Sequence, residues 1–404
     1  MSRIVAVEPV LPEHQYSQEE ISAVVGPLVA PDPARAPLLR RLHTNAGVER
    51  RHLALPLERY ADVHSMGASN AVFLHEGVDL AEQAARRALA SAGIDPHEVD
   101  HVFTTSVTGV AAPSLDVLLA DRLGLRTDVR RTPSFGLGCA GGAAGLARVH
   151  DHLLGRPRDV SLLVSVELCS LTLQHGDDST ANLVASGLFG DGAAAVVVVG
   201  DEHPLARPVH RGDAVGQPVG RTATVLDSRS RLYPGTVDAL GWDVRDSGFG
   251  IVLSSELPEL LRAHLLADVK GLLADHGLAP ADVPTWVVHA GGPKVIDAVR
   301  DALSLAEEDL WASRASLTDA GNLSSASVLD VLARTLRAGD APAGSPAVLM
   351  AFGPGVATEM VLLRLEGRAC CDAAASAVSA ASADTPADLP AAVPAGAGSP
   401  AAGR

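Results

Sequence analysis

One cysteine lies in a glycine-rich stretch, FGLGCAGG, over residues 135–142. The thiolate is the form of cysteine that attacks carbonyl carbons, and the unpaired amides at the start of a helix favour it. The glycines around Cys139 would let backbone amides approach a substrate closely enough to form an oxyanion hole. A free cysteine is also a common packing residue, so this stretch alone leaves both interpretations open.

Two further residues could supply the chemistry that a nucleophilic cysteine requires. His289 ends the apolar run TWVVHA and precedes a glycine-rich turn. Its imidazole could handle protons, although a histidine in a strand is often a hydrogen-bonded core residue. Asn322 lies in DAGNLSSAS ahead of an expected helix, where its amide could donate to a substrate or cap the helix. The three side chains form a catalytic set only if the fold brings them together.

Strands and helices alternate along the chain, and this order must position the three residues. Near-continuous apolar runs between helical patterns indicate an α/β protein whose sheet is covered on both faces. The expected strands lie at 101–107, 160–168, 193–199, 285–290, 347–352 and 358–365. The expected helices lie at 78–92 and 256–275, and others begin near Cys139, Lys294 and Ser324.

The two halves of the chain repeat this order. FGDG at 189–192 and FGPG at 352–355 each lead into an apolar strand. His289 follows Thr105 by 184 positions, and Asn322 follows Cys139 by 183. These offsets predict an internal duplication with Cys139 and Asn322 at corresponding helix starts, which would bring the three residues together in a crevice between the halves.

The motif set resembles that of the type III polyketide synthases, the chalcone-synthase-like enzymes of the thiolase fold. The motifs are GCAGG around Cys139, HAGGP at 289–293, GNLSSAS at 321–327, LFGDGAAA at 188–195 and FGPG at 352–355. The resemblance implies a thiolase-like α/β fold with two duplicated αβαβα halves related by a pseudo-twofold axis. It implies no metal or redox cofactor, and its substrates are malonyl-CoA and an acyl-CoA.

The expected organisation has four parts. An N-terminal half over 1–200 carries Cys139, and a segment rich in Pro, Gly and charge at 201–221 connects it to a C-terminal half over 222–366. The stretch 367–404 is rich in Ala and Pro and cannot bury enough apolar surface to offset its ordering entropy, so we expect a disordered tail.

The resemblance also implies residue roles. Cys139 would accept the acyl group, and His289 with Asn322 would polarise the malonyl thioester and stabilise the enolate left by decarboxylation. Phe189 would be the gatekeeper aromatic. The substrate pocket would be lined by Thr105, Cys169, Thr172, Ala263, Phe352, Gly353 and Pro354, and CoA would be bound by Arg41 and Lys294.

Several positions depart from the family pattern. Ala351 replaces the first Gly of the family's GFGPG loop, which shapes the cyclisation pocket, and Ala263 stands where a second gatekeeper Phe is expected. Cys169 stands where bacterial members that accept long chains tend to carry Cys, and a core cysteine is an equally good reading of it. Asn45 replaces one expected CoA-binding lysine.

Composition excludes several other classes of function. A net charge of −16 disfavours nucleic-acid binding, and no apolar run approaches the roughly 20 residues of a membrane helix. No signal-peptide pattern is evident at the N-terminus, so we expect a cytoplasmic protein. The four cysteines, at 139, 169, 370 and 371, show no metal-ligand or disulfide spacing.

The expected reaction is extension of an acyl-CoA starter by malonyl-CoA. The small residues at 169 and 263 favour a long fatty acyl starter and an alkylresorcinol or alkylpyrone product, in a homodimeric enzyme that pairs through the face near 111–119. A malonyl-primed tetrahydroxynaphthalene-type synthase is the alternative. A condensing enzyme of the β-ketoacyl-carrier-protein synthase III type, a thiol hydrolase with a Cys–His pair and a catalytically silent binding subunit are further alternatives.

Overall fold

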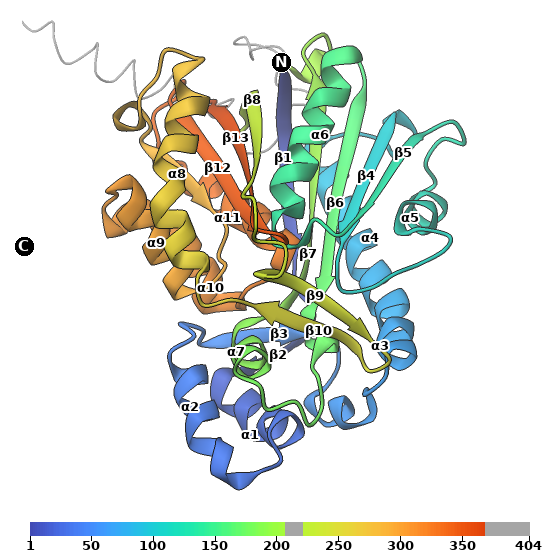
Figure 1. Cartoon of the computed structure of the whole chain (residues 1–404). Helices are drawn as coiled ribbons and strands as arrows, with labels where there is room; N and C mark the ends of the chain where they lie inside the picture. The colour runs from blue at the N-terminus through green and yellow to red at the C-terminus, as the bar shows by residue number, and fades with distance from the viewer. Residues whose placement is uncertain (207–220, 368–404) are drawn as a thin grey trace, which may run out of the picture. The chain divides into compact units, whose positions relative to one another are not determined.

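A computed structural model of the chain describes residues 1–206 and 221–367 (Figure 1). The predicted tail and most of the predicted connecting segment lie outside these residues. The strands are β1 (Ser2–Val10), β2 (His14–Ser17), β3 (Arg50–Leu53), β4 (His101–Ser106), β5 (Arg130–Phe135), β6 (Val160–Leu168), β7 (Asp191–Gly200), β8 (Ala223–Leu232), β9 (Leu240–Arg245), β10 (Gly248–Leu253), β11 (Thr285–Val288), β12 (Pro346–Gly353) and β13 (Ala357–Leu365). The α-helices are α1 (Gln18–Val29), α2 (Ala36–Thr44), α3 (Met66–Val72), α4 (Val78–Ala92), α5 (Leu115–Leu123), α6 (Gly141–Gly155), α7 (Thr180–Leu188), α8 (Leu257–Ala274), α9 (Pro293–Leu303), α10 (Trp311–Ala320) and α11 (Ser327–Ala338).

Within the described residues, nine strands form one mixed sheet in the order β11-β12-β13-β8-β1-β7-β6-β4-β5. Outward from the β1–β8 junction, each half has the same pairing: antiparallel, antiparallel, then parallel. The junction itself is short and antiparallel, from Ser2 opposite Val225 to Ile4 opposite Ala223. This repeat of order and direction is the duplication that the sequence predicts.

The helices complete a layered α/β architecture around the two halves of the sheet. α6 contacts β4, β6 and β7 of one half and β12 and β13 of the other, and α11 contacts strands of both halves as well. α4 covers the outer side of β1, β6 and β7, whereas α8 packs against β8 and β13 and against α9 (Figure 1). The pair α6–α11 therefore lies between the halves, and the residues that precede these two helices meet there.

The predicted elements match the structure with one informative difference. The predicted helix 78–92 and strand 160–168 have the bounds of α4 and β6. Cys139 and Ser324 lie in 3-10 turns, Gly138–Ala140 and Ser324–Ala326, that precede α6 and α11. Because both turns have three residues and lead directly into a helix, Ser325 is the counterpart of Cys139, and the prediction that Asn322 corresponds to Cys139 is wrong by three residues.

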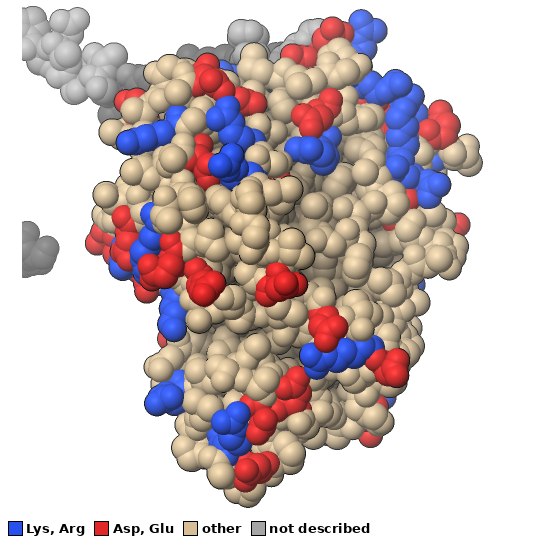
Figure 2. Space-filling view, viewed as in Figure 1, with Lys and Arg blue, Asp and Glu red and all other residues tan. Residues whose placement is uncertain are grey.

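Three observations concern the described residues. On the face seen in Figure 2, the Lys and Arg side chains lie among Asp and Glu, and the central part of this face is largely uncharged. No helix among these residues has the length and apolar character to cross a membrane. No group of three or more His, Cys, Asp or Glu side chains there could hold a metal ion.

Candidate active site

The turn that carries Cys139 packs closely against the loop after β12. Gly138 has φ +53°, and a Cβ there would lie 2.3 Å from Pro354 Cδ. A Cβ on Gly353 would lie 2.6 Å from the carbonyl oxygen of Leu137. Glycine is required at both positions, because the two backbones approach more closely than a side chain would allow. Cys139 is thereby held at the base of α6 with its side chain partly exposed.

Two side chains of the segment before α11 contact the sulfur. Cys139 Sγ donates to Ser324 Oγ at 3.6 Å, and the Asn322 side chain acts to lower the pKa of the thiol. Asn322 Oδ1 accepts from the Ser324 backbone N–H at 2.8 Å, which orients the amide. Ser324 has φ +49°, a conformation that costs energy for a residue with a side chain and that aims its hydroxyl at the sulfur.

His289 follows β11 and is 2% exposed. Its backbone N–H donates to the Met350 carbonyl at 2.9 Å, and the Asn322 amide donates to the Gly291 carbonyl, two residues further on, at 3.4 Å. Contacts therefore link Cys139 to Asn322 and Asn322 to the turn after His289. The structure thus places Cys139, from one half, near Ser324 and Asn322, and Asn322 against the turn that follows His289 in the other half.

Both Cys139 and His289 are neutral in the resting site. Burial lowers the pKa of His289 to about 3. Burial also raises the pKa of Cys139, and the neighbouring side chains of Ser324 and Asn322 only partly oppose this. Loss of water therefore opposes the thiolate form that the helix start favours.

Sequence reasoning missed a buried carboxylate beside the site. Glu167, at the end of β6, is fully buried and accepts hydrogen bonds from Val107 N–H at 3.1 Å, Thr108 Oγ1 at 2.8 Å and the hydroxyl of Ser325. Its charge further raises the pKa of Cys139. The signal was available, since Glu167 is the one charged residue in the apolar run VSVELC.

Thr105, Phe189 and Cys169 were predicted to line the substrate pocket. Thr105 is buried beneath α6, its Oγ1 2.7 Å from where a Cβ on Gly141 would lie. Phe189 pairs with Asn322 through an isolated β-bridge, so the predicted gatekeeper is directly beside the predicted amide donor. Cys169 is 3% exposed and lines a cavity that Phe189 also lines.

The remaining predicted residues are spread more widely. Phe352 is buried in β12, and Thr172 Oγ1 donates to the Cys169 carbonyl at 2.7 Å. Ala263 is exposed on α8, so its place at the pocket entrance stays a prediction. Arg41 on α2 and Lys294 on α9 are both exposed.

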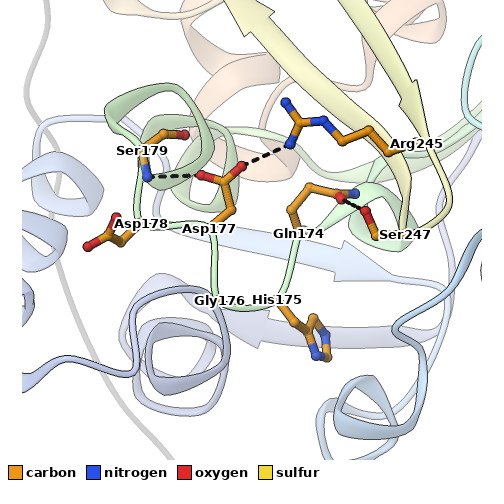
Figure 3. Close-up of a pocket in the computed structure, with 8 residues that line it drawn as sticks. All are labelled: Gln174, His175, Gly176, Asp177, Asp178, Ser179, Arg245 and Ser247. Carbon is orange, nitrogen blue, oxygen red and sulfur yellow. Dashed lines mark hydrogen bonds and ion pairs between the residues drawn. The ribbon is translucent and has the colours of Figure 1, made fainter.

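The loop between 172 and α7 is tied to the β9–β10 hairpin (Figure 3). The Gln174 side chain accepts from Ser247 Oγ at 2.6 Å, and Asp177 lies 3.3 Å from Arg245 in an ion pair. Figure 3 shows the side chains of the loop and the hairpin turned toward each other across a surface pocket. These contacts fix the loop that follows the Cys169 turn to the hairpin.

Comparisons with known proteins agree with this geometry. Models of the N-terminal and C-terminal domains of chalcone and stilbene synthases match residues 5–202 and 225–366. The chain is 50% identical over 361 residues to 1,3,6,8-tetrahydroxynaphthalene synthase of Streptomyces peucetius subsp. caesius, covering 89% of this chain and 92% of that protein. It is 33% identical over 352 residues to the synthase of that name from Streptomyces coelicolor, with coverages of 87% and 89%.

Solved structures of related synthases also resemble this chain. The crystal structure of 1,3,6,8-tetrahydroxynaphthalene synthase from Streptomyces coelicolor superposes with a TM-score of 0.81 at 32% identity, covering 90% of this chain and 99% of that one. Germicidin synthase from the same organism superposes with a TM-score of 0.79 at 27% identity, covering 90% and 100%. The chain therefore belongs to the chalcone and stilbene synthase family and is a type III polyketide synthase of the thiolase fold, an acyl-transferring and decarboxylating condensing enzyme.

Proposed function

We propose that the enzyme is primed by malonyl-CoA and makes a tetrahydroxynaphthalene-type product. The observation that supports this most is the 50% identity over 361 residues to 1,3,6,8-tetrahydroxynaphthalene synthase. The earlier expectation of a long-chain fatty acyl starter has no such support. Malonyl priming, which was the alternative at the level of sequence, becomes the preferred proposal.

Loading begins with attack of Cys139 Sγ on the thioester carbonyl of the starter. The thiol proton ends on the departing CoA sulfur, so the step forms one thioester and releases CoA thiol. Ser324 and Asn322 donate toward the sulfur as its charge develops, which compensates for the burial that disfavours the thiolate.

Extension uses His289 and Asn322 on the carbonyl of a second malonyl thioester. A neutral imidazole and an amide can each donate one hydrogen bond to the oxygen that becomes negative when CO₂ leaves. The resulting enolate carbon attacks the acyl group on Cys139 and displaces the sulfur. Repetition lengthens the chain by two carbons at a time before it cyclises.

A second candidate is a long-chain starter, which would need to widen the space beside Cys169. This cavity has room for only about 10 Å³, and its walls include Ile21, Val25, Leu53 and Phe189 together with the Arg51 side chain. Each methylene buried there would add about 0.8 kcal/mol to binding. The two candidates therefore differ in the acyl chain that would occupy this cavity, which is malonyl-derived in the first and a fatty chain in the second.

We also propose a homodimer and a CoA site. β5 ends the nine-stranded sheet, and its residues are mostly exposed, with Phe135 53% exposed. An uncovered edge strand beside the exposed Val110 favours pairing with a second copy on this face.

For CoA, the loop after α2 packs at Gly47 against Pro293, so Lys294 lies near that loop and could contact the same phosphate-bearing ligand as Arg41.

The test incubates purified enzyme with malonyl-CoA alone and with malonyl-CoA plus an acyl-CoA series from acetyl to palmitoyl, with products identified by mass spectrometry. We expect one dominant product from malonyl-CoA alone. Preferential formation of alkylated products would establish the second candidate instead. Cys139→Ala should abolish products, whereas Cys169→Ala, a matched loss of a thiol, should retain them; synthesis by Cys139→Ala would refute the assigned nucleophile.

A further inference from the structure

Arg51 is a buried cation on a strand outside the large sheet. The residue faces inward from β3 and is 3% exposed, and among the described residues β3 pairs only with β2. Burial lowers the pKa of Arg51 to about 10, so the guanidinium remains charged at neutral pH. A charged donor forms a stronger hydrogen bond than a neutral one, and more so away from water. The group that accepts from Arg51 is therefore held firmly.

That group is the peptide unit between Phe189 and Gly190. Arg51 Nη1 donates to the Phe189 carbonyl at 2.7 Å. The N–H of the same planar peptide unit belongs to Gly190 and donates to the Asn322 carbonyl at 3.0 Å. The Asn322 N–H donates in turn to the Leu188 carbonyl at 2.9 Å, which completes the isolated β-bridge between Phe189 and Asn322. One peptide unit thus links the guanidinium to the backbone of Asn322.

The two segments of this bridge approach too closely to admit side chains. A Cβ on Gly190 would lie 2.1 Å from the Ala320 carbonyl oxygen. Gly321 has φ +74°, and a Cβ there would lie 2.8 Å from the Leu188 carbonyl oxygen. The same Cβ would lie 3.2 Å from both Cγ and Cδ of Arg51. The methylenes of Arg51 therefore pack against one segment of the bridge, while its guanidinium holds the other.

The remaining donors of Arg51 do not explain its presence by stability. Its buried Nε and Nη2 have no hydrogen-bond partner among the described residues. Asp191, whose charge acts on Arg51, accepts instead from Ala54 N–H at 2.7 Å and from Ser170 N–H at 2.8 Å. Burying unpaired N–H groups of a charged side chain is costly, and such a cost is typical of residues that serve a functional site.

We propose that Arg51 is a positioning residue for decarboxylation, which holds Asn322 in place through the peptide unit between Phe189 and Gly190. The proposed function assigns the Asn322 amide as a donor to the malonyl carbonyl, and this inference rests on that assignment. A donor bound to a peptide carbonyl polarises the unit and strengthens the hydrogen bond from its N–H. Removing the guanidinium weakens the bond to Asn322 and lets its segment shift, and a displacement near 1 Å costs about 100-fold in rate.

The kinetic test compares Arg51→Met with Arg50→Met. Methionine keeps an unbranched side chain against Gly321 but cannot donate. Arg50 is the neighbour of Arg51 on the same strand, but its side chain is 49% exposed and lies 3.8 Å from Glu49. Release of CO₂ from malonyl-CoA is measured over a range of substrate concentrations. We expect Arg51→Met to lower kcat about 10- to 100-fold and to change KM by less than about threefold, because the interaction acts on the reacting geometry. Arg51→Lys should recover part of kcat, and Arg50→Met should match wild type.

Hydrogen exchange provides a readout of position. Mass spectrometry of peptides spanning 186–192 and 318–325 follows the Gly190 and Asn322 N–H groups. Both should exchange faster in Arg51→Met than in wild type or Arg50→Met, whereas a peptide within α4 should exchange equally in all three. If Arg51→Met fails to fold in urea-unfolding measurements, Arg51→Lys carries the test, with a lower kcat and faster exchange at the bridge expected.

Two results would overturn the proposal. One is a wild-type kcat in folded Arg51→Met or, where that variant does not fold, in Arg51→Lys. The other is a rise in KM at unchanged kcat, which would make Arg51 a substrate-binding residue. Asn322→Ala, assayed in parallel, separates this inference from the proposed function. Unchanged CO₂ release in Asn322→Ala would refute the role that the proposed function gives to Asn322, whereas a slow Asn322→Ala beside a fast Arg51→Met would refute the role of Arg51 alone.

Discussion

Gly142→Ala tests how closely α6 must pack against the segment before α11. A Cβ at Gly142 would lie 2.3 Å from the carbonyl oxygen of Ser325 and 2.8 Å from Val328 Cγ1. Carbon atoms do not approach a backbone oxygen below 3.0 Å, so the two segments must separate by about 0.7 Å. A backbone atom cannot rotate away as the end of a side chain can.

The expected cost has two opposing parts. Forcing a methyl group into a packed contact costs about 1–3 kcal/mol, and alanine regains about 0.5–1 kcal/mol over glycine within a helix. We expect a net loss of about 1–2 kcal/mol in the free energy of unfolding. The same separation moves Cys139 away from Ser324 and Asn322, and a misplacement near 1 Å costs about 100-fold in rate.

Gly155→Ala is the matched control, because Gly155 ends the same helix and has no atom within 4 Å of an added Cβ. Urea unfolding gives the stability of both variants, and malonyl-CoA turnover under conditions where each is fully folded gives their activity. Gly155→Ala should match wild type in rate. If Gly142→Ala were as stable and as active as Gly155→Ala, the inferred role of the α6–α11 contact would be wrong.

Three further outcomes are expected. His289→Ala and Asn322→Ala should each slow CO₂ release from malonyl-CoA about 100-fold, since each removes a donor worth about 3 kcal/mol to the enolate; unchanged release in both would exclude that role. Cys169→Phe should shorten the longest acyl chain accepted without slowing CO₂ release, and an unaltered chain-length profile would contradict the cavity as its binding place. Burial lowers the pKa of His101 from 6.5 to about 4, so the unfolded chain takes up a proton at higher pH than the folded protein, and stability falls as pH drops below about 6.5. His101→Gln should remove about 2 kcal/mol of the loss between pH 7 and pH 5, measured by urea unfolding at both values; an unchanged difference would refute this account.

The parts of the fold that sequence patterns predicted are those with regular burial. α4 has alanines and leucines at helical spacing, and β6 is buried along its whole length, so both were found with their bounds. β5 and β8 were not assigned as strands, and the residues of β5 and of the second half of β8 are mostly polar and solvent-exposed. β1, β2, β3, β9 and β10 were not assigned either, although β1 is largely buried. The strand conformation of β5 and β8 comes from pairing with neighbours that are distant in sequence.

The residues of the candidate site also fall into those that the sequence predicted and those that it did not. Cys139, His289 and Asn322 were predicted because each stands in a short motif of distinctive composition. Ser324 and Arg51 were not, because their importance depends on contacts rather than on residue type. Arg51 lies in the charged run ERRH, which is typical of a solvated surface, and only the fold turns it inward.

The correspondence between the Cys139 turn and the Ser325 turn limits how many reactions one chain can run at once. The two turns hold equivalent places in the two halves, Gly138–Ala140 before α6 and Ser324–Ala326 before α11. In the present protein the second position holds Ser325, whose hydroxyl is committed to Glu167 and Ser165. The duplicated architecture therefore offers a thiol at only one of its two equivalent turns, and with Cys139 as the nucleophile each polypeptide would hold one covalent intermediate at a time.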